Sequence, residues 1–149
     1  MLKLSKLTDY ATVILSFMAK DSRHVLNAME VSEATGIALP TVSKLLKLLA
    51  KAGMLVSTRG AKGGYALSRK PENISIASVI SVMEGPIALT ECSISQQVCE
   101  QAAGCHIGAN WNLINKTVHN ALESVTLADM VITVPRPEEI LVPVASLYR

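Results

Sequence analysis

The chain has 149 residues, of which half are hydrophobic and only 3% aromatic, and its formal net charge is +2. This length allows one compact domain with an added helical arm, and the scarcity of aromatic residues predicts a mainly α fold with an aliphatic core. No stretch is long and apolar enough to cross a bilayer, and the N-terminus lacks a signal-peptide cleavage pattern, so we expect a cytoplasmic protein without a membrane partner.

Positive charge is concentrated in the first half of the chain. Residues 1–70 contain 11 Lys and Arg against 4 Asp and Glu, whereas residues 71–149 contain 3 against 8. A strongly basic half is typical of proteins that bind a polyanion such as DNA. A basic face that contacts only water is the alternative that charge alone leaves open.

The apolar periodicity predicts three helices in this basic half. The first covers residues 7–18, the second begins after the N-cap Asn27 and ends at Gly36, and Pro40 opens the third. The second and third helices, with their short connection, match a helix-turn-helix. The third helix has a polar face of hydroxyls and lysines, which suit contacts in a DNA major groove: Thr41, Ser43, Lys44, Lys47 and Lys51.

The next predicted element is a β-hairpin. β-forming residues at 55–58 and 65–67 flank a glycine-rich turn at 59–64. A hairpin directly after a helix-turn-helix forms a winged helix. Arg59 and Lys62 in the turn can neutralise phosphates or enter a narrow minor groove, so the sequence predicts double-stranded DNA as a partner.

The rest of the chain predicts an arm. A fourth helix begins after Ser75 and ends at Gly85, so we expect a DNA-binding head at 1–85, a cysteine loop at 86–106, a long helix and a short terminal helix at 107–131, and an extended or disordered tail at 132–149. The long helix carries a heptad-like apolar stripe of Ile107, Trp111, Ile114, Val118, Ala121 and Val125. We expect this dimerisation helix to pack against a second copy in a homodimer. Packing against its own head is the alternative.

All three cysteines of the chain, Cys92, Cys99 and Cys105, lie in the loop between head and arm. Three thiols cannot pair completely, and cytosolic thiols stay reduced, so a metal centre is favoured over a disulfide. Thiolates hold iron–sulfur clusters, whereas the C-x6-C-x5-C spacing lacks the close pairs of common structural zinc sites. An iron–sulfur cluster is therefore favoured, and zinc or redox-switched free thiols are the alternatives.

With these motifs in order, residues 1–131 resemble the Rrf2 family of bacterial winged-helix regulators, which includes the iron–sulfur regulator IscR and the nitric-oxide sensor NsrR. The similarity is most specific in LTDYA, in LPTVSKLLKLLAKAGMLVSTRGAKGGYAL, in the three cysteines and in the helix around Trp111. Through GAKGGYAL and EGPIALTEC the chain looks most similar to regulators of the SUF iron–sulfur assembly system. The resemblance implies a homodimer that represses, and sometimes activates, transcription according to the state of its cluster.

The resemblance also implies roles for individual residues. By position, the DNA contacts fall on Pro40, Thr41, Ser43, Lys44 and Arg59, and the cluster ligands on Cys92, Cys99 and Cys105. Some members place a histidine ligand three residues after the third cysteine, but this chain has Gly108 there and His106 beside Cys105. In the nitric-oxide branch an aspartate of the partner subunit completes the cluster, and the matching residue here is Asp9. A 2Fe–2S cluster is expected rather than a 4Fe–4S cluster.

The sequence therefore predicts a DNA-binding transcriptional regulator, a repressor of iron–sulfur assembly genes, whose cluster orders the cysteine loop and sets the angle between head and dimerisation helix. The alternatives are a regulator switched by thiol oxidation or zinc, and an iron–sulfur carrier or scaffold. An enzyme with a small-molecule substrate is not expected. The histidines show no spacing typical of acid–base or nucleophilic catalysis, and no phosphate-binding glycine motif precedes a helix.

Overall fold

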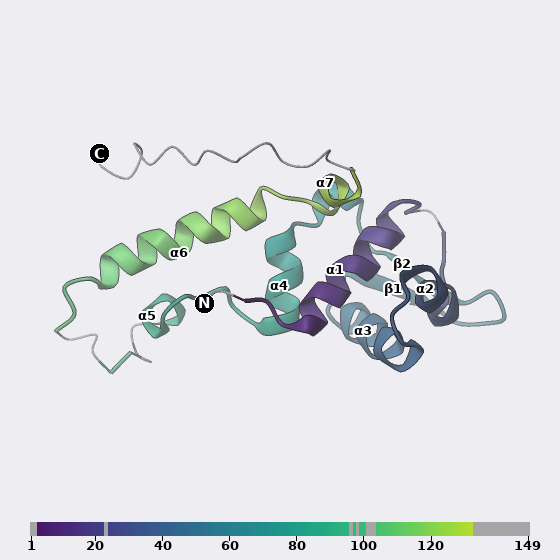
Figure 1. The fold of residues 1–149 in the computed structure, drawn as a ribbon, viewed down its shortest axis with the longest axis horizontal. Helices are drawn as coiled ribbons and strands as arrows, with labels where there is room; N and C mark the ends of the chain where they lie inside the picture. Colours follow the sequence, from purple (N-terminus) through teal and green to yellow (C-terminus); the bar gives the residue numbers. More distant parts are fainter. Residues whose placement is uncertain (1–2, 23, 96, 98, 101–103, 133–149) are drawn as a thin grey trace.

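The computed structural model describes residues 3–22, 24–95, 97, 99–100 and 104–132. A helical head is followed by a long helix that extends away from it (Figure 1). In chain order the elements are α1 (Lys6–Ala19), α2 (Ala28–Thr35), α3 (Leu39–Lys51), β1 (Leu55–Thr58), β2 (Gly64–Leu67), a 3-10 turn (Pro71–Asn73), α4 (Ile76–Glu84), α5 (Glu91–Ile94), α6 (Gly108–Glu123) and α7 (Leu127–Val131). The predicted tail lies outside the described residues apart from Ile132.

α1 is the central helix of the head, in agreement with the apolar spacing over 7–18. Ser5 is its N-cap, and the Ser5 hydroxyl accepts a hydrogen bond from the Thr8 amide at 3.2 Å. Its buried face packs against α2, α4 and α7 and consists of Thr8, Ala11, Ile14, Leu15 and Met18. Burial of each larger aliphatic side chain stabilises the fold by roughly 1.5 to 3 kcal/mol, so this face fixes the helices around it.

The predicted helix-turn-helix is confirmed in α2 and α3. The Asn27 carboxamide accepts hydrogen bonds from the amides of Met29 and Glu30, and the Glu30 carboxylate accepts one from the Asn27 amide at 2.7 Å. Gly36 ends α2 in the left-handed conformation, with φ of 71°. Pro40 lies in the first turn of α3, where a missing amide costs no helical hydrogen bond. The opposite side of α3 is buried through Val42, Leu45, Leu46 and Leu49.

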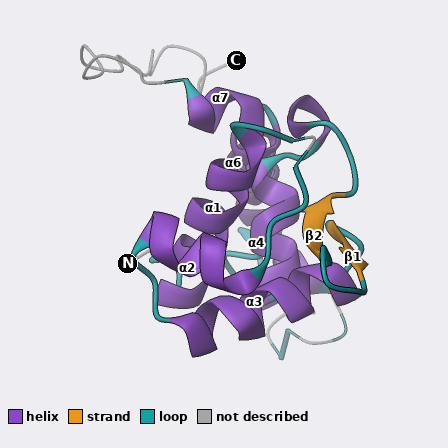
Figure 2. Ribbon diagram, turned by 90° about the vertical axis from the view of Figure 1, so that its right-hand side faces the viewer, coloured by secondary structure: helices purple, strands orange, loops and turns teal. Residues whose placement is uncertain are grey.

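The predicted hairpin is confirmed in β1 and β2, which pair antiparallel with Thr58 opposite Gly64. It lies at one edge of the head (Figure 2). A further bridge joins Tyr65 to Leu26 through two backbone hydrogen bonds of 2.9 and 2.8 Å. Because Leu26 directly precedes the N-cap of α2, the backbone of the wing is tied to the helix-turn-helix.

Replacing Gly64 by Ala is expected to destabilise the head by about 1 to 3 kcal/mol, the usual cost of forcing atoms into a filled site. A Cβ at this position would lie 2.5 Å from the backbone carbonyl oxygen of Leu26, which is far inside van der Waals contact. Gly104→Ala is the matched control, because a Cβ there meets no atom within 4 Å. Chemical denaturation measures both variants, and equal free energies of unfolding would contradict this close approach.

α6 forms the arm, and the chain then returns to the head. No residue of α6 is buried, and α5 packs beside it. α7 packs on α1, where Leu127 is fully buried in the core of the head. That core therefore extends beyond residue 85, and the loop that sequence periodicity left without a helix contains α5. Within the described ranges, no helix is long and apolar enough to span a membrane.

Candidate functional site

The exposed face of α3 is basic. The helix contains three lysines and no acidic residue, and all three lysine side chains are exposed. The predicted DNA contacts lie on this face: Pro40 and Lys44 are exposed, and Thr41 and Ser43 are half-buried. Because the buried leucines hold the other side of the helix, these side chains can enter a DNA groove without disturbing the core.

The wing adds two further positive charges. Arg59 and Lys62 are exposed in the turn between β1 and β2. The turn is tight, since a Cβ at Gly63 would lie 2.4 Å from the carbonyl oxygen of Thr58, and Gly60 has a positive φ of 116°. β1 also contacts α3. The recognition helix and the cationic turn therefore belong to one packed unit, as a winged helix requires.

The three cysteines are free thiols between α4 and α6. Cys92 lies on α5 and is half-buried, Cys99 is half-buried, and Cys105 is exposed three residues before α6 begins. In the part of the chain that the structure describes, no three Cys, His, Asp or Glu side chains are gathered closely enough to hold a metal ion. That the three cysteines bind a cluster together thus stays a prediction.

Polar side chains around Cys92 connect it to α6. The Thr90 hydroxyl lies 3.1 Å from the Cys92 sulfur and 3.1 Å from the Ser93 hydroxyl. The Ser93 hydroxyl donates a hydrogen bond to the Asn112 carboxamide of α6 at 3.3 Å. Asn115, one turn further along α6, bonds the backbone on the other side of Thr90. Sequence periodicity did not identify Asn112 and Asn115 as contacts of the cysteine segment. The only signal in the sequence is that these asparagines lie beside the apolar stripe.

The two candidates for a fourth ligand have different surroundings. His106 is exposed beside Cys105. Asp9 is exposed on α1, where it lines a groove of about 430 Å³ with Thr12, residues from the end of α2 and Met130 of α7. No cysteine is among the residues that line this groove. An Asp9 carboxylate so positioned is accessible to a second subunit.

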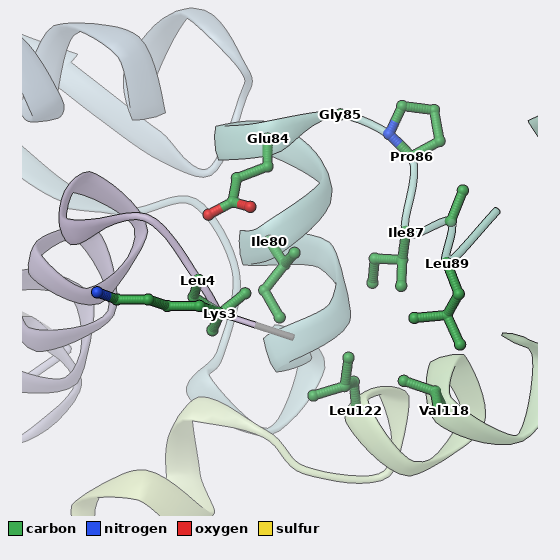
Figure 3. Close-up of a pocket in the computed structure, with 11 residues that line it drawn as sticks. Lys3, Leu4, Ile80, Glu84, Gly85, Pro86, Ile87, Leu89, Val118 and Leu122 are labelled. Carbon is green, nitrogen blue, oxygen red and sulfur yellow. The ribbon is translucent and has the colours of Figure 1, made fainter. Parts of the chain in front are cut away.

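A second groove, of about 450 Å³, lies between the head and the arm. Ile87 and Leu89 of the linker point toward Val118 and Leu122 of α6 (Figure 3). The remaining walls come from the segment before α1, from the end of α4 and from the rest of the linker, through Lys3, Leu4, Ile80, Glu84, Gly85, Pro86 and Ala88. The lining is mostly apolar, so the linker to the cysteines and α6 present apolar side chains to the same groove, in addition to the hydrogen bonds that join them.

Glu84 joins the last turn of α4 to the beginning of α1. Its carboxylate accepts hydrogen bonds from the Thr8 hydroxyl and from the Ser5 amide, the latter at 2.7 Å. These bonds, that from Thr8 above all, hold the pKa of the Glu84 carboxyl below its usual value. Asp9 follows Thr8, so the first turn of α1, which carries the candidate ligand, is bonded to the end of α4, where the linker to the cysteines begins.

A helix-turn-helix with a basic second helix and a basic hairpin behind it defines a winged-helix DNA-binding protein. The profile of the Rrf2 family, described as an iron-dependent transcriptional regulator, matches residues 4–133. The protein belongs to the Rrf2 family of transcriptional regulators. The family and the mainly α winged-helix fold expected from the sequence are thereby confirmed.

Relatives with curated names agree with this assignment. The chain is 31% identical to protein rrf2 of Nitratidesulfovibrio vulgaris over 130 residues, which cover 87% of each chain. It is 27% identical to the HTH-type transcriptional regulator IscR of Aliivibrio salmonicida, over 88% of this chain and 78% of the relative. The family description and the IscR name denote transcriptional regulators rather than enzymes, as the sequence predicts. None of these names refers to the SUF system.

Two solved structures resemble this fold over most of the chain. CymR of B. subtilis, described as the global cysteine regulator, matches with a TM-score of 0.72 and 29% identity, over 88% of this chain and 97% of CymR. IscR of T. potens matches with a TM-score of 0.66 and 28% identity, over 87% of this chain and 86% of IscR. The fold is therefore common to regulators that are named for different roles.

Proposed function

We propose that this protein is a homodimeric transcriptional repressor whose binding to a near-palindromic DNA operator depends on an iron–sulfur cluster held by Cys92, Cys99 and Cys105. The observation that carries the proposal is the position of the three thiols. They are the only cysteines of the chain, and they lie in one segment that joins α4 of the head to α6. A ligand of this segment is well placed to change how the arm is held on the DNA-binding head.

The donor set fits an iron–sulfur cluster. Thiolates are the soft ligands that hold such clusters, and the Thr90 hydroxyl is close enough to donate a hydrogen bond to a metal-bound Cys92 sulfur. Three thiols leave one further position, which we assign to Asp9 of the partner subunit. When bound, the cluster makes the protein sensitive to oxidation and to iron limitation, because either condition removes the cluster. We expect the 2Fe–2S type.

The homodimer is supported by the exposed apolar stripe of α6. Trp111 and Ile114 of α6 are 36% and 43% exposed, and Ile107 and Val125, which lie just before and just after the helix, are 55% and 37% exposed. Apolar side chains repeated in this way are typical of a helix that packs against a partner. In a two-fold dimer the two α3 helices meet two DNA half-sites, so one protein dimer reads one near-palindrome.

The target genes that we propose are those of iron–sulfur cluster assembly. Support comes from the iron-dependent description of the family and from the likeness to regulators named IscR. A repressor that binds a cluster is loaded when the cell has clusters to spare, so its DNA binding follows the cellular supply of clusters. Chromatin immunoprecipitation with sequencing tests the assignment: we expect enrichment at assembly-gene promoters, and enrichment confined to other promoters would overturn it.

Anaerobic purification with iron and acid-labile sulfide analysis tests the cluster itself. We expect iron and sulfide in equal amounts, with visible charge-transfer absorption, in the wild-type protein. The matched control replaces Cys92, Cys99 and Cys105 by Ala and is expected to retain the helical fold but no iron. Zinc in place of iron, or iron bound equally by the control, would reject an iron–sulfur cluster at these thiols.

The fourth ligand can be assigned by a paired substitution. We predict that Asp9→Ala changes the visible absorption and the stability of the bound cluster more than His106→Ala does, since Asp9 is the proposed ligand and His106 is an exposed neighbour of Cys105. Absorption and circular dichroism spectra of the two anaerobic variants make the comparison. The opposite order would assign the fourth position to His106.

A thiol-redox switch without a cluster is the second candidate, and the likeness to the cysteine regulator CymR favours it. Cys105 is exposed, so an oxidant can reach its sulfur. In this case, peroxide treatment of the metal-free protein changes operator affinity, and a thiol reductant reverses the change. We expect no such effect beyond that of the cysteine-free control. A carrier or scaffold function has no support among the relatives named above.

A further inference from the structure

Both polar atoms of the Asn115 carboxamide bond the cysteine linker to α6. Its Nδ2 donates a hydrogen bond to the Ile87 carbonyl at 3.1 Å, and its Oδ1 accepts one from the Leu89 amide at 3.0 Å. The side chain is half-buried, so losing it would leave a linker donor and acceptor unpaired beside an apolar groove. A shift of the linker along α6 breaks both bonds together.

The same linker continues directly into the cysteine site. Two residues separate Leu89 from Cys92, and one of these, Thr90, bonds both the Cys92 sulfur and the Ser93 hydroxyl. Ile87 and Leu89 also point toward α6 across the apolar groove (Figure 3). The Asn115 clamp, which consists of the Asn115 side chain with Ile87 and Leu89, therefore helps to set the position of the Cys92 thiol relative to α6, together with the hydrogen bond from Ser93 to Asn112.

The other end of α6 is fixed to the head. The Ile76 amide bonds the Val125 carbonyl at 2.8 Å, and the Leu127 amide bonds the Ile74 carbonyl at 2.9 Å. The Ser75 hydroxyl donates a hydrogen bond to the Glu123 carboxylate at 2.7 Å. The C-terminal end of α6 is thus attached to the start of α4, and the middle of α6 is attached to the cysteine linker. A movement of α6 at one attachment therefore changes its position at the other.

We propose that Asn115 is a positioning residue for the cysteine site, and that its clamp couples the state of the Cys92 segment to the position of α6. This inference rests on the proposed function, in which these thiols hold a cluster. The clamp keeps the Cys92 thiol in place for the cluster, and it makes α6 respond when the segment rearranges on cluster loss. A side chain with only a structural role would affect stability without affecting the thiol.

The test compares Asn115→Leu with Asn120→Leu. The first substitution keeps the branched shape of the side chain but removes both hydrogen bonds, and the second makes the same change at an exposed position of the same helix. In metal-free protein that retains Cys92 as its only cysteine, we expect N115L to raise the alkylation rate of Cys92 several-fold and N120L to leave it unchanged. In loaded protein with all three cysteines, we expect N115L to lose iron to a chelator about tenfold faster than wild type.

Each outcome has one reading. Unchanged alkylation and unchanged iron loss in N115L would overturn the clamp. If wild-type protein holds no cluster but N115L still exposes the Cys92 thiol, the proposed cluster fails while the positioning role stands. If N115L does not fold, Asn115→Asp replaces it: the carboxylate still accepts from the Leu89 amide but cannot donate to the Ile87 carbonyl. An intermediate alkylation rate supports the clamp, and a wild-type rate with wild-type iron loss refutes it.

Discussion

Replacing Lys44 by Ala is expected to weaken specific operator binding by about ten- to a hundredfold, which corresponds to the loss of one good base-edge contact. Lys44 is exposed at the start of α3, and the core residues of that helix lie on its opposite side. The substitution should therefore leave the free energy of unfolding unchanged. Fluorescence anisotropy at fixed salt measures the affinity for the operator and for an unrelated duplex.

Arg59 provides a contrasting case on the wing. Arg59→Ala should weaken binding to all duplexes similarly and reduce the salt dependence by about one phosphate contact, because an exposed cation in a turn contacts backbone rather than a unique base. Lys116→Ala is the matched control, since Lys116 is also exposed but lies on α6. If K44A kept full operator affinity, or if K116A lost as much affinity as K44A, α3 would not be the recognition helix.

Replacing Ile114 by Glu is expected to convert the dimer to a folded monomer. Ile114 is 43% exposed in the centre of the apolar stripe, and a charge there would be buried without a partner between two α6 helices. A monomer binds the two half-sites independently, so operator affinity should fall by at least about a hundredfold. Sedimentation velocity and anisotropy on the same samples measure both effects.

Leu113→Glu is the control for this prediction. Leu113 precedes Ile114 in the sequence and is 65% exposed, but it does not belong to the apolar stripe. L113E should remain a dimer with nearly wild-type affinity. A dimeric I114E, or a monomeric L113E, would show that another surface joins the subunits.

The helical head was predictable because its signals are local. Asn27, Gly36 and Ser75 mark helix ends through bonds to residues at most four positions away, and these signals hold in any surroundings. The alternation of β-formers around a glycine-rich turn likewise specifies the hairpin. The winged helix could therefore be recognised before any tertiary contact was known.

The contacts of the cysteine linker were not predictable from the same signals. Glu84 bonds Thr8 across 76 residues, and Asn115 bonds Ile87 across 28, so neither pair leaves a trace in local periodicity. α5 is a single short helix within a polar segment, and the hydrogen bond from Ser93 to Asn112 joins it to α6, whereas no residue of α5 is buried. Leu127 was expected in the arm, but the return of α7 to α1 buries it in the head.

These long-range contacts give cluster control a physical route. The cysteine linker is clamped to α6 by Asn115, α6 is bonded to the start of α4 at its other end, and α4 is joined to α1 by Glu84. The proposed cluster, by ordering the cysteine segment, would therefore act on an arm that is bonded to the DNA-binding head. Cluster loss is expected to change operator affinity by altering that arm, without any change in α3 itself.

The most direct test of cluster control is the operator affinity of one anaerobic sample, measured before and after a chelator removes its iron and again after the cluster is rebuilt. We expect affinity to change by at least about tenfold on removal, within the usual range of coupling between two sites, and to return on rebuilding. The variant without cysteines should match the metal-free protein in affinity and sequence preference. Equal affinity and equal sequence preference of loaded, metal-free and cysteine-free protein would contradict control by a cluster.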